Sequence, residues 1–317
     1  MEPHPYYQAW GSILRTTQEL MWDSVGESVA RQLPTLMARA KAFADRPRLG
    51  SLRLDRALAI PRYQSAVDIH VMPGSYHSDL AQGDVFAGAL YDRGLYLYAM
   101  GGLGPCNEDI GAGGCAYLKK HFPDFAPKRI LDLGCTIGNS TLAYAQAYPE
   151  AEVFGVDLGA ASLRYAHARA ESLGVAAHFS QQNAERTDFE ECSFDLVVSA
   201  VLLHETSMAA LPRIIQECRR LLRAGGIMCH TDVPQVEGDA FDLFIPDWDT
   251  EGNNEPFMSK MRDLDFRQLF EAAGFRRRSF FSGYVPNEHL NAKRPVTFRG
   301  GSGKKGKPWA VYGAIAG

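Results

Sequence analysis

The stretch Ile130-Leu-Asp-Leu-Gly-Cys-Thr-Ile-Gly138 decides the predicted fold. An apolar run ends at Asp132, glycines follow at Gly134 and Gly138, and a helical pattern begins directly afterwards. Glycines let the backbone approach a ligand closely, and the start of a helix offers free amide groups to a polar ligand. In an open α/β sheet, such a crevice lies at the carboxyl ends of the strands. The stretch therefore predicts a strand, a ligand-binding turn and a helix.

Short apolar runs alternate with helical segments on the C-terminal side of this stretch. Strands are predicted at 129–133, 152–156, 176–181, 194–199 and 226–231, and helices at 139–148, 160–173 and 208–222. Two further strands, 278–284 and 309–315, are expected to be neighbours. Alternation of this kind favours an α/β fold, in which helices cover both faces of a mostly parallel sheet.

The N-terminal part of the chain has a different pattern. Residues 6–43 carry apolar side chains at helical spacing with breaks near Gly26 and Pro34, so two or three helices are predicted. The glycine-dense segment 101–114 is predicted to be a mobile loop. Within it, Asn107 is a candidate cap for a helix that extends towards His121. The N-terminal part is therefore expected to be mainly helical.

Asp157 supports a nucleotide ligand for the turn. It ends the second predicted strand, where a carboxylate can accept hydrogen bonds from both hydroxyls of a ribose. The rival is a dinucleotide site with the pattern G-x-G-x-x-G, but the chain lacks the second glycine after Gly134. In addition, Asp132 would repel a pyrophosphate and attract an ammonium group. A tight turn without a ligand is the remaining alternative, and Asp157 argues against it.

Five segments together resemble the ordered motifs of the class I S-adenosylmethionine (SAM)-dependent methyltransferases. They are 130–138, Val153-Phe-Gly-Val-Asp-Leu158, Asn183-Ala-Glu185, Phe194-Asp-Leu-Val-Val-Ser199 and Leu221-Leu-Arg-Ala-Gly-Gly226. The resemblance implies a Rossmann-like, seven-stranded, mostly parallel sheet with helices on both faces, and SAM as the cofactor. It divides the chain into a mainly helical substrate or lid region, residues 1–122, and a SAM-binding methyltransferase domain, residues 123–317.

The same resemblance implies where SAM is held. Asp132, Gly134 and Gly138 would border its methionine part, Asp157 its ribose and Leu158 its adenine. The complete set of expected cofactor residues is Asp132, Gly134, Cys135, Gly138, Asp157, Leu158, Asn183, Ala184, Ala200 and Val201. Two residues depart from the family pattern, because Asn183 replaces the usual acidic residue at the adenine edge and Thr136 replaces a common glycine.

His204 and Glu205 are the candidate catalytic residues. They follow the fourth predicted strand, where the family faces the methyl acceptor. The alternative for such a pair is a helix cap or a structural polar contact. A general base is needed only if the acceptor carries a proton, whereas a carboxylate acceptor would need positioning donors such as Arg, His or Tyr. The sequence does not choose between these acceptors.

Three stretches are expected to build the acceptor pocket: the N-terminal helices, residues 68–79 and residues 241–257. Together they combine aromatic and polar side chains, as clefts for small organic ligands do. Tyr76, His77 and Trp248 are the candidate substrate residues. His70, His77 and Asp79 do not form a closed set of ligands, so no metal site is predicted.

Charge and composition narrow the class of protein. The 33 Lys and Arg residues against 37 Asp and Glu residues give a net charge of −4, which argues against nucleic acid or an anionic membrane as a partner. The basic cluster 299–307 is interleaved with Gly and Ser, which favours a solvated loop. No apolar run has the roughly 20 residues of a membrane span. The six cysteines form no C-x-x-C pair, which suits a cytoplasmic protein with reduced thiols.

We therefore expect a SAM-dependent methyltransferase that acts on a small molecule, with oxygen of a hydroxyl or carboxylate as the favoured target. Another SAM-using enzyme on this fold, such as a cyclase or an N- or C-methyltransferase, stays open as an alternative. A non-catalytic SAM-binding subunit is the alternative of a different class. A homodimer is open as well.

Overall fold

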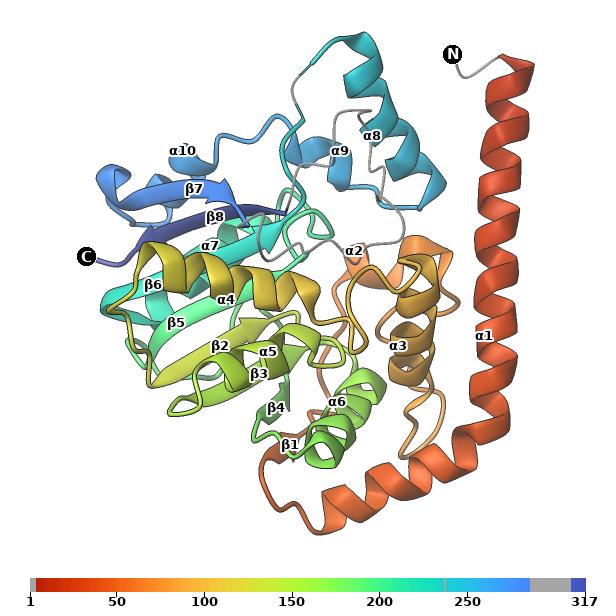
Figure 1. Cartoon of the computed structure of the whole chain (residues 1–317), viewed down its shortest axis with the longest axis horizontal. Helices are drawn as coiled ribbons and strands as arrows, with labels where there is room; N and C mark the ends of the chain where they lie inside the picture. Colours follow the sequence, from red (N-terminus) through yellow and green to blue (C-terminus); the bar gives the residue numbers. More distant parts are fainter. Residues whose placement is uncertain (1–3, 237, 286–308) are drawn as a thin grey trace.

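The computed structural model describes residues 4–236, 238–285 and 309–317, and its centre is an eight-stranded sheet (Figure 1). The strand order is β1-β4-β3-β2-β5-β6-β8-β7. All pairs are parallel except those of β8, which lies antiparallel to both β6 and β7. The strands are β1 Ser51–Arg53, β2 Arg129–Leu133, β3 Glu152–Asp157, β4 His178–Gln181, β5 Phe194–Ala200, β6 Leu222–Asp232, β7 Phe280–Tyr284 and β8 Ala310–Ile315.

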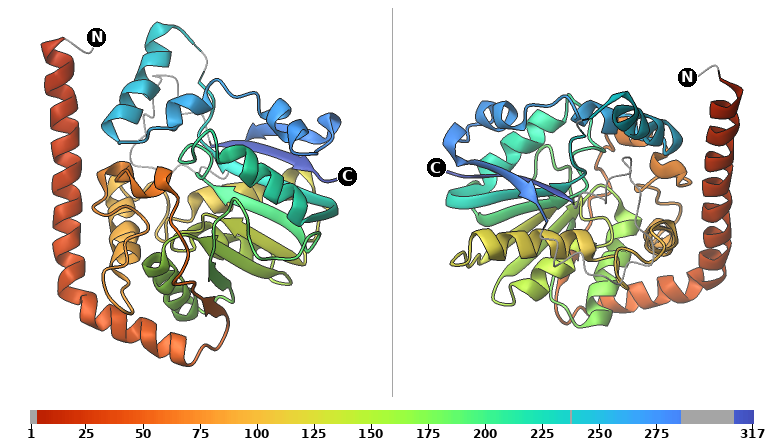
Figure 2. Two further views of the ribbon diagram at one scale, coloured as in Figure 1. Left: turned by 180° about the vertical axis from the view of Figure 1, so that it is seen from behind. Right: turned by 45° about the horizontal axis from the view of Figure 1, so that its top comes forward.

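Helices cover both faces of this sheet. On one face lie α4, α5 and α6, and on the other lie α7 and α10 (Figures 1 and 2). The α-helices are α1 Pro5–Asp45, α2 Arg62–Ser65, α3 Phe86–Tyr98, α4 Asp109–His121, α5 Asn139–Ala147, α6 Ala160–Leu173, α7 Leu211–Leu221, α8 Ala240–Gly252, α9 Met258–Met261 and α10 Phe266–Ala272. Two short 3-10 helices are η1 Ile69–Val71 and η2 Arg277–Ser279.

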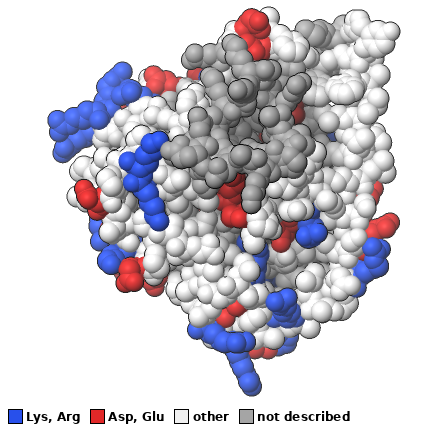
Figure 3. All heavy atoms as spheres, in the orientation of Figure 1, with Lys and Arg blue, Asp and Glu red and all other residues white. Residues whose placement is uncertain are grey.

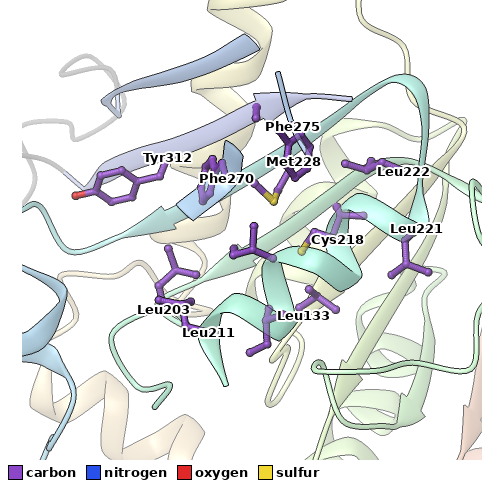
Figure 4. Close-up of a cluster of buried hydrophobic side chains, with 14 of the residues drawn as sticks. Leu133, Leu203, Leu211, Cys218, Leu221, Leu222, Met228, Phe270, Phe275 and Tyr312 are labelled. Carbon is purple, nitrogen blue, oxygen red and sulfur yellow. The ribbon is translucent and has the colours of Figure 1, made fainter. Parts of the chain in front are cut away.

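The main hydrophobic core fills the space between the sheet and helices α7 and α10. Leu133, Cys218 and Phe270 meet there with side chains that are at most 1% exposed (Figure 4). A second cluster around Leu118 and Tyr144 packs α4 and α5 against the opposite face. These clusters fix the carboxyl ends of β2, β3 and β5 relative to one another.

The predicted α/β class is confirmed, and the strand count is one higher than expected. The additional strand is β1, which pairs with the edge strand β4 through Ser51–His178, Leu52–Phe179 and Arg53–Ser180. Three residues are too few to show a period, so only the tertiary contact reveals this strand. The expected pairing of the last two strands is confirmed, because β7 and β8 lie side by side.

The prediction of two or three helices over residues 6–43 is wrong, because α1 is one helix of 41 residues. Gly26 and Pro34 lie inside it, although they cost a helix about 1 and 3 kcal/mol relative to alanine. The helix is supported by contacts, since Trp22 and Val29 are buried against the body of the protein. Its axis bends in the second half (Figure 1), as an internal proline would cause.

The segment 101–114 is also more ordered than expected, because its second half is the start of α4. The glycines there permit close packing: a Cβ at Gly111 would lie 2.5 Å from the Cα of Ser140 in α5. The helix begins after Glu108 instead of after Asn107. Helix α8 was likewise missed, although Asp239 forms a capping box at its start. The basic cluster 299–307 lies outside the described residues.

Charges are not concentrated on the visible face of the molecule. In Figure 3, acidic and basic side chains are interspersed among uncharged ones over the described surface. None of the helices in the described part of the chain is both long enough and apolar enough to cross a membrane.

The carboxylate of Glu171 ties the N-terminal region to α6. One of its oxygens accepts from the backbone amides of Arg48, Leu49 and Gly50 at 3.0, 2.9 and 3.1 Å. Burial alone would raise the pKa of Glu171, but these amides outweigh burial and lower it. The carboxylate thereby positions the chain directly before β1.

We predict that Glu171→Ala lowers the free energy of unfolding by about 2–3 kcal/mol, because three amides lose a charged acceptor. Urea unfolding checks this, with the exposed Glu150→Ala as control. Because the folded pKa is lowered, the stabilisation is complete at neutral pH and is lost as the pH falls through the carboxyl range. Equal loss of stability in both variants would contradict the prediction.

Candidate active site

A cavity opens at the carboxyl ends of β2, β3 and β5, and it holds about 1040 Å³ of space, open solvent included. The N-terminal region and the sheet domain both contribute to its wall. Of the expected cofactor residues, the cavity is lined by Gly134, Cys135, Asp157, Leu158, Asn183, Ala184, Ala200 and Val201. Asp132 and Gly138 do not line it. Most of the expected cofactor set is therefore gathered around one space.

The carboxylate of Asp157 is held in place by backbone amides. One oxygen accepts from Thr136 at 2.9 Å and the other from Gly159 at 2.8 Å. Burial raises the pKa of Asp157, and the amide hydrogen bonds counteract part of that rise. Each oxygen keeps lone-pair capacity for a second donor. Thr136, with φ +47°, occupies the left-handed region that usually favours glycine, and its contact with Asp157 runs through the backbone amide alone.

Asp132 lies beneath the cavity wall. It is fully buried, and its Oδ2 accepts from the hydroxyls of Ser140 and Thr141, each at 2.6 Å. Its Oδ1 has no hydrogen-bond partner among the described residues. Burial raises the pKa of Asp132 to about 6. The side chain therefore anchors the start of α5 and keeps one unused acceptor.

The adenine-side candidates line the cavity with local hydrogen bonds. The Oδ1 of Asn183 accepts from the backbone amide of Glu185 at 2.9 Å, which leaves it one further lone pair. Gly138, by contrast, is the N-cap of α5, and a Cβ there would come within 3.0 Å of Phe179. Gly138 thus serves the packing of the turn.

Val201 lines the cavity in an unusual backbone conformation. Its φ of +52° lies in the left-handed region, which is costly for a β-branched side chain. Its amide donates to Thr231 at 2.8 Å, and this bond holds the strand end in place. Strain of this kind is concentrated at binding sites, where the surrounding structure enforces it.

The predicted pair His204 and Glu205 point in different directions. His204 is 4% exposed and does not line the cavity, and its Nδ1 lies 2.5 Å from Oδ1 of Asp232. Burial lowers the pKa of His204, but Asp232 and Glu255 outweigh burial and raise it to about 10. A protonated imidazole does not accept a proton at neutral pH. His204 therefore lies off the cavity wall, in contact with Asp232 and Glu255.

Glu205 does line the cavity. Its Oε1 accepts from the hydroxyl of Tyr76 at 2.9 Å and lies 3.4 Å from Nε2 of His70. Burial raises the pKa of Tyr76 well above its ordinary value, so this hydroxyl stays a donor. The carboxylate is therefore oriented by two groups from the N-terminal region.

His70 and Glu255 are site residues for which the sequence prediction gave no role in the chemistry. The Nδ1 of His70 lies 3.0 Å from Oε1 of Glu255, and the Oε2 of Glu255 lies 3.8 Å from Nε2 of His204. Burial raises the pKa of Glu255, and the two histidines counteract this. In the sequence, the one signal for His70 and Glu255 is that they lie in the stretches 68–79 and 241–257, which are expected to build the acceptor pocket.

The candidate substrate residues are separated in the structure. Tyr76 and His77 line the cavity, and burial lowers the pKa of His77, which favours its neutral form. Trp248 does not line it, because its ring stacks on that of Trp10 in α1 with centroids 6.5 Å apart. Within the described residues, no group of three or more His, Cys, Asp or Glu side chains is arranged to hold a metal ion.

Comparison with known proteins gives consistent results. A family model described as "Methyltransferase domain" matches residues 130–226. An uncharacterized methyltransferase of Synechocystis is 31% identical over 162 residues, which are 49% of this chain and 71% of that protein. A ubiquinone biosynthesis O-methyltransferase of Pseudomonas aeruginosa is 35% identical over 154 residues, 47% of this chain and 60% of that protein. The match covers 61% and 53% of the length of two further curated relatives.

Among solved structures, phosphoethanolamine N-methyltransferase 2 of Haemonchus contortus shares the fold. The TM-score is 0.51 at 17% identity, and the match covers 72% of this chain and 58% of that one.

We predict that His204 stays protonated well above neutral pH, with a titration midpoint of about 10. Any stability that its charge contributes would be complete at neutral pH and lost as the pH rises through that value. NMR titration of the histidine Cε1–H signals measures this directly. Asp232→Asn should lower the midpoint, because it removes the negative charge 2.5 Å away. A wild-type midpoint near 6.5 would contradict the prediction.

Proposed function

The chain belongs to the class I SAM-dependent methyltransferases, and we propose that it transfers the methyl group of SAM to a hydroxyl oxygen of an uncharged small molecule. When bound, SAM would supply a methyl group on a sulfonium sulfur: as an acceptor lone pair bonds to the methyl carbon, the carbon–sulfur bond would break and its electron pair would stay on sulfur. The protein's own task is to hold the acceptor in line and to exclude water. The observation that carries the proposal is the Glu205 carboxylate, which lies on the cavity wall and accepts a hydrogen bond from Tyr76.

The residues present fit the cofactor. The Asp157 carboxylate is fixed by two amides and keeps capacity for ribose hydroxyls, and Leu158 offers an apolar contact beside it. The unpartnered Oδ1 of Asp132 is a negative group beneath the turn, which suits an ammonium on the methionine part. We assign Asp157, Leu158, Asn183, Ala184, Ala200 and Val201 to cofactor binding on these grounds.

The charge of the cavity favours an uncharged acceptor. No Arg or Lys is among the described residues that line it, whereas Asp157 and Glu205 are. A carboxylate acceptor would be repelled by these groups and would lack a bidentate partner. Tyr63, Tyr76 and Tyr91 provide aromatic walls that suit a flat acceptor such as a phenol.

A hydroxyl acceptor needs a group that takes its proton. Glu205 is such a group, because its carboxylate reaches the cavity while His204 stays protonated behind it. Glu205 takes the proton of the acceptor hydroxyl, and the electron pair of the O–H bond stays on the acceptor oxygen. That oxygen bonds to the methyl carbon as the carbon–sulfur bond breaks, with the electron pair of that bond going to sulfur. The Pseudomonas relative, which is named as an O-methyltransferase, supports oxygen as the target.

Transfer of radiolabel from SAM to a panel of uncharged phenols and alcohols tests the proposal. We expect Glu205→Gln to keep its affinity for SAM in calorimetry and to lose about 10²- to 10⁴-fold in kcat, the range of general-base catalysis. The matched control is Glu152→Gln, an exposed residue of β3 outside the cavity. Tight SAM binding without any transfer would overturn the enzymatic proposal and favour a non-catalytic SAM-binding subunit.

Asp157→Asn tests cofactor binding independently of proton transfer to Glu205. It should weaken SAM binding roughly tenfold to hundredfold, because a charge-assisted hydrogen bond is worth about 1.5–3 kcal/mol. Calorimetry with SAM measures this without any acceptor. Unchanged affinity would contradict the assignment of Asp157 to the ribose.

A further inference from the structure

A series of acidic and imidazole side chains leads away from the cavity, beginning at Glu205 and ending at Asp232. Through ion-pair contacts, Glu205 meets His70 at 3.4 Å, His70 meets Glu255 at 3.0 Å and Glu255 meets His204 at 3.8 Å. The last member of the series is Asp232, whose Oδ1 lies 2.5 Å from Nδ1 of His204. Positive and negative groups thus alternate along the series if both imidazoles are protonated.

The side chains of this series come from separate segments of the protein. His70 belongs to the N-terminal region, Glu255 follows α8, and Glu205 follows β5. The side chains of Glu255, His204 and Asp232 are at most 5% exposed, that of Glu205 is 13% exposed, and that of His70 is 24% exposed. Unpaired charges at such depth would be costly. The imidazoles share the task of pairing them with other donors, because Asp232 also accepts from the amides of Leu203 and Val233, each at 2.8 Å. Glu205 likewise accepts from the hydroxyl of Tyr76.

The backbone of His70 is fixed by two hydrogen bonds from side chains of α1. Its carbonyl accepts from the side chains of Gln18 at 2.9 Å and Trp22 at 2.8 Å, both on α1. Its φ of +56° lies in the left-handed region, and the flanking Ile69 and Met72 are fully buried. A conformation that costs energy persists only where the surroundings enforce it, and here α1 and the core enforce it.

From this geometry we propose that His70 is the positioning residue of the methyl-transfer site, an imidazolium that holds the Glu205 carboxylate towards the acceptor and lies in ion-pair contact with Glu255. This inference rests on the proposed function for the identity of the proton acceptor. Its consequence is that α1 and the segment after α8 form part of the catalytic arrangement, since α1 holds the backbone of His70 and Glu255 contacts its ring.

The electrostatic surroundings of His70 agree with a charged ring. Burial lowers the pKa of His70, but Glu255 and Glu205 outweigh burial and raise it, while His204 opposes them. Asp249 of α8 also interacts with His70, and the ring of Tyr98 in α3 lies 5.7 Å from it. A raised pKa favours the charged ring over that of an unperturbed histidine, and the positioning charge is lost as the pH rises through that pKa.

NMR titration of the full-length chain, without SAM or acceptor, tests the charge. The His70 Cε1–H signal, assigned by its loss in His70→Gln, should titrate above 6.5. Glu205→Gln and Glu255→Gln should each lower its midpoint by about one pH unit, because each removes one neighbouring negative charge. The exposed His121→Gln is the matched control and should leave the midpoint unchanged. A midpoint at or below 6.5, or one that Glu205→Gln does not move, would overturn the proposal.

Kinetics then test the positioning role. With an acceptor from the phenol and alcohol panel, His70→Gln should lower kcat at least tenfold, leave the affinity for SAM unchanged, and remove the fall in rate on the alkaline side of the pH profile. Wild-type kcat and pH profile in this variant would overturn the inference. Absence of transfer by the wild-type chain would instead count against the proposed function, and the titration would still decide the charge of His70.

Discussion

Carboxylates buried at the carboxyl end of a parallel sheet must each find a partner, and this constraint shapes the site. Burying a charge without compensation is costly. The structure solves the problem in two ways. At β2 and β3, hydroxyls donate to one oxygen of Asp132, and backbone amides donate to both oxygens of Asp157. At β5 and β6, histidines face Glu205 and Asp232. The first arrangement leaves fixed acceptors for a cofactor, whereas the second creates groups that can hold or move a proton.

The two halves of the site therefore differ in how closely they depend on local sequence. The partners of Asp132 and Asp157 lie within about one strand-helix-strand step, so the motif at 130–138 and Asp157 could be predicted together. The partners of Glu205 lie 129 residues away at Tyr76 and further still at His70. No spacing rule links residues so far apart, and His70 and Glu255 were accordingly not recognised as members of the site.

The fold shows the same division. The strands and helices between β2 and β6 have enough periodic residues to be predicted. Strand β1 has three residues and depends on the edge of β4 and on Glu171. Gly26 and Pro34 suggested breaks in α1, but burial of Trp22 and Val29 supports the helix through them. The glycines of α4 suggested a loop, yet at Gly111 the close approach of Ser140 in α5 leaves no room for a side chain. Tertiary contact overrides local preference in each case.

The decisive measurement is a crystal structure of the chain with S-adenosylhomocysteine. We expect the ribose hydroxyls to lie on the Asp157 carboxylate, and the sulfur to face the part of the cavity bordered by Glu205 and Tyr76. A ligand whose ribose lies away from Asp157, or a sulfur that faces away from Glu205, would contradict this expectation.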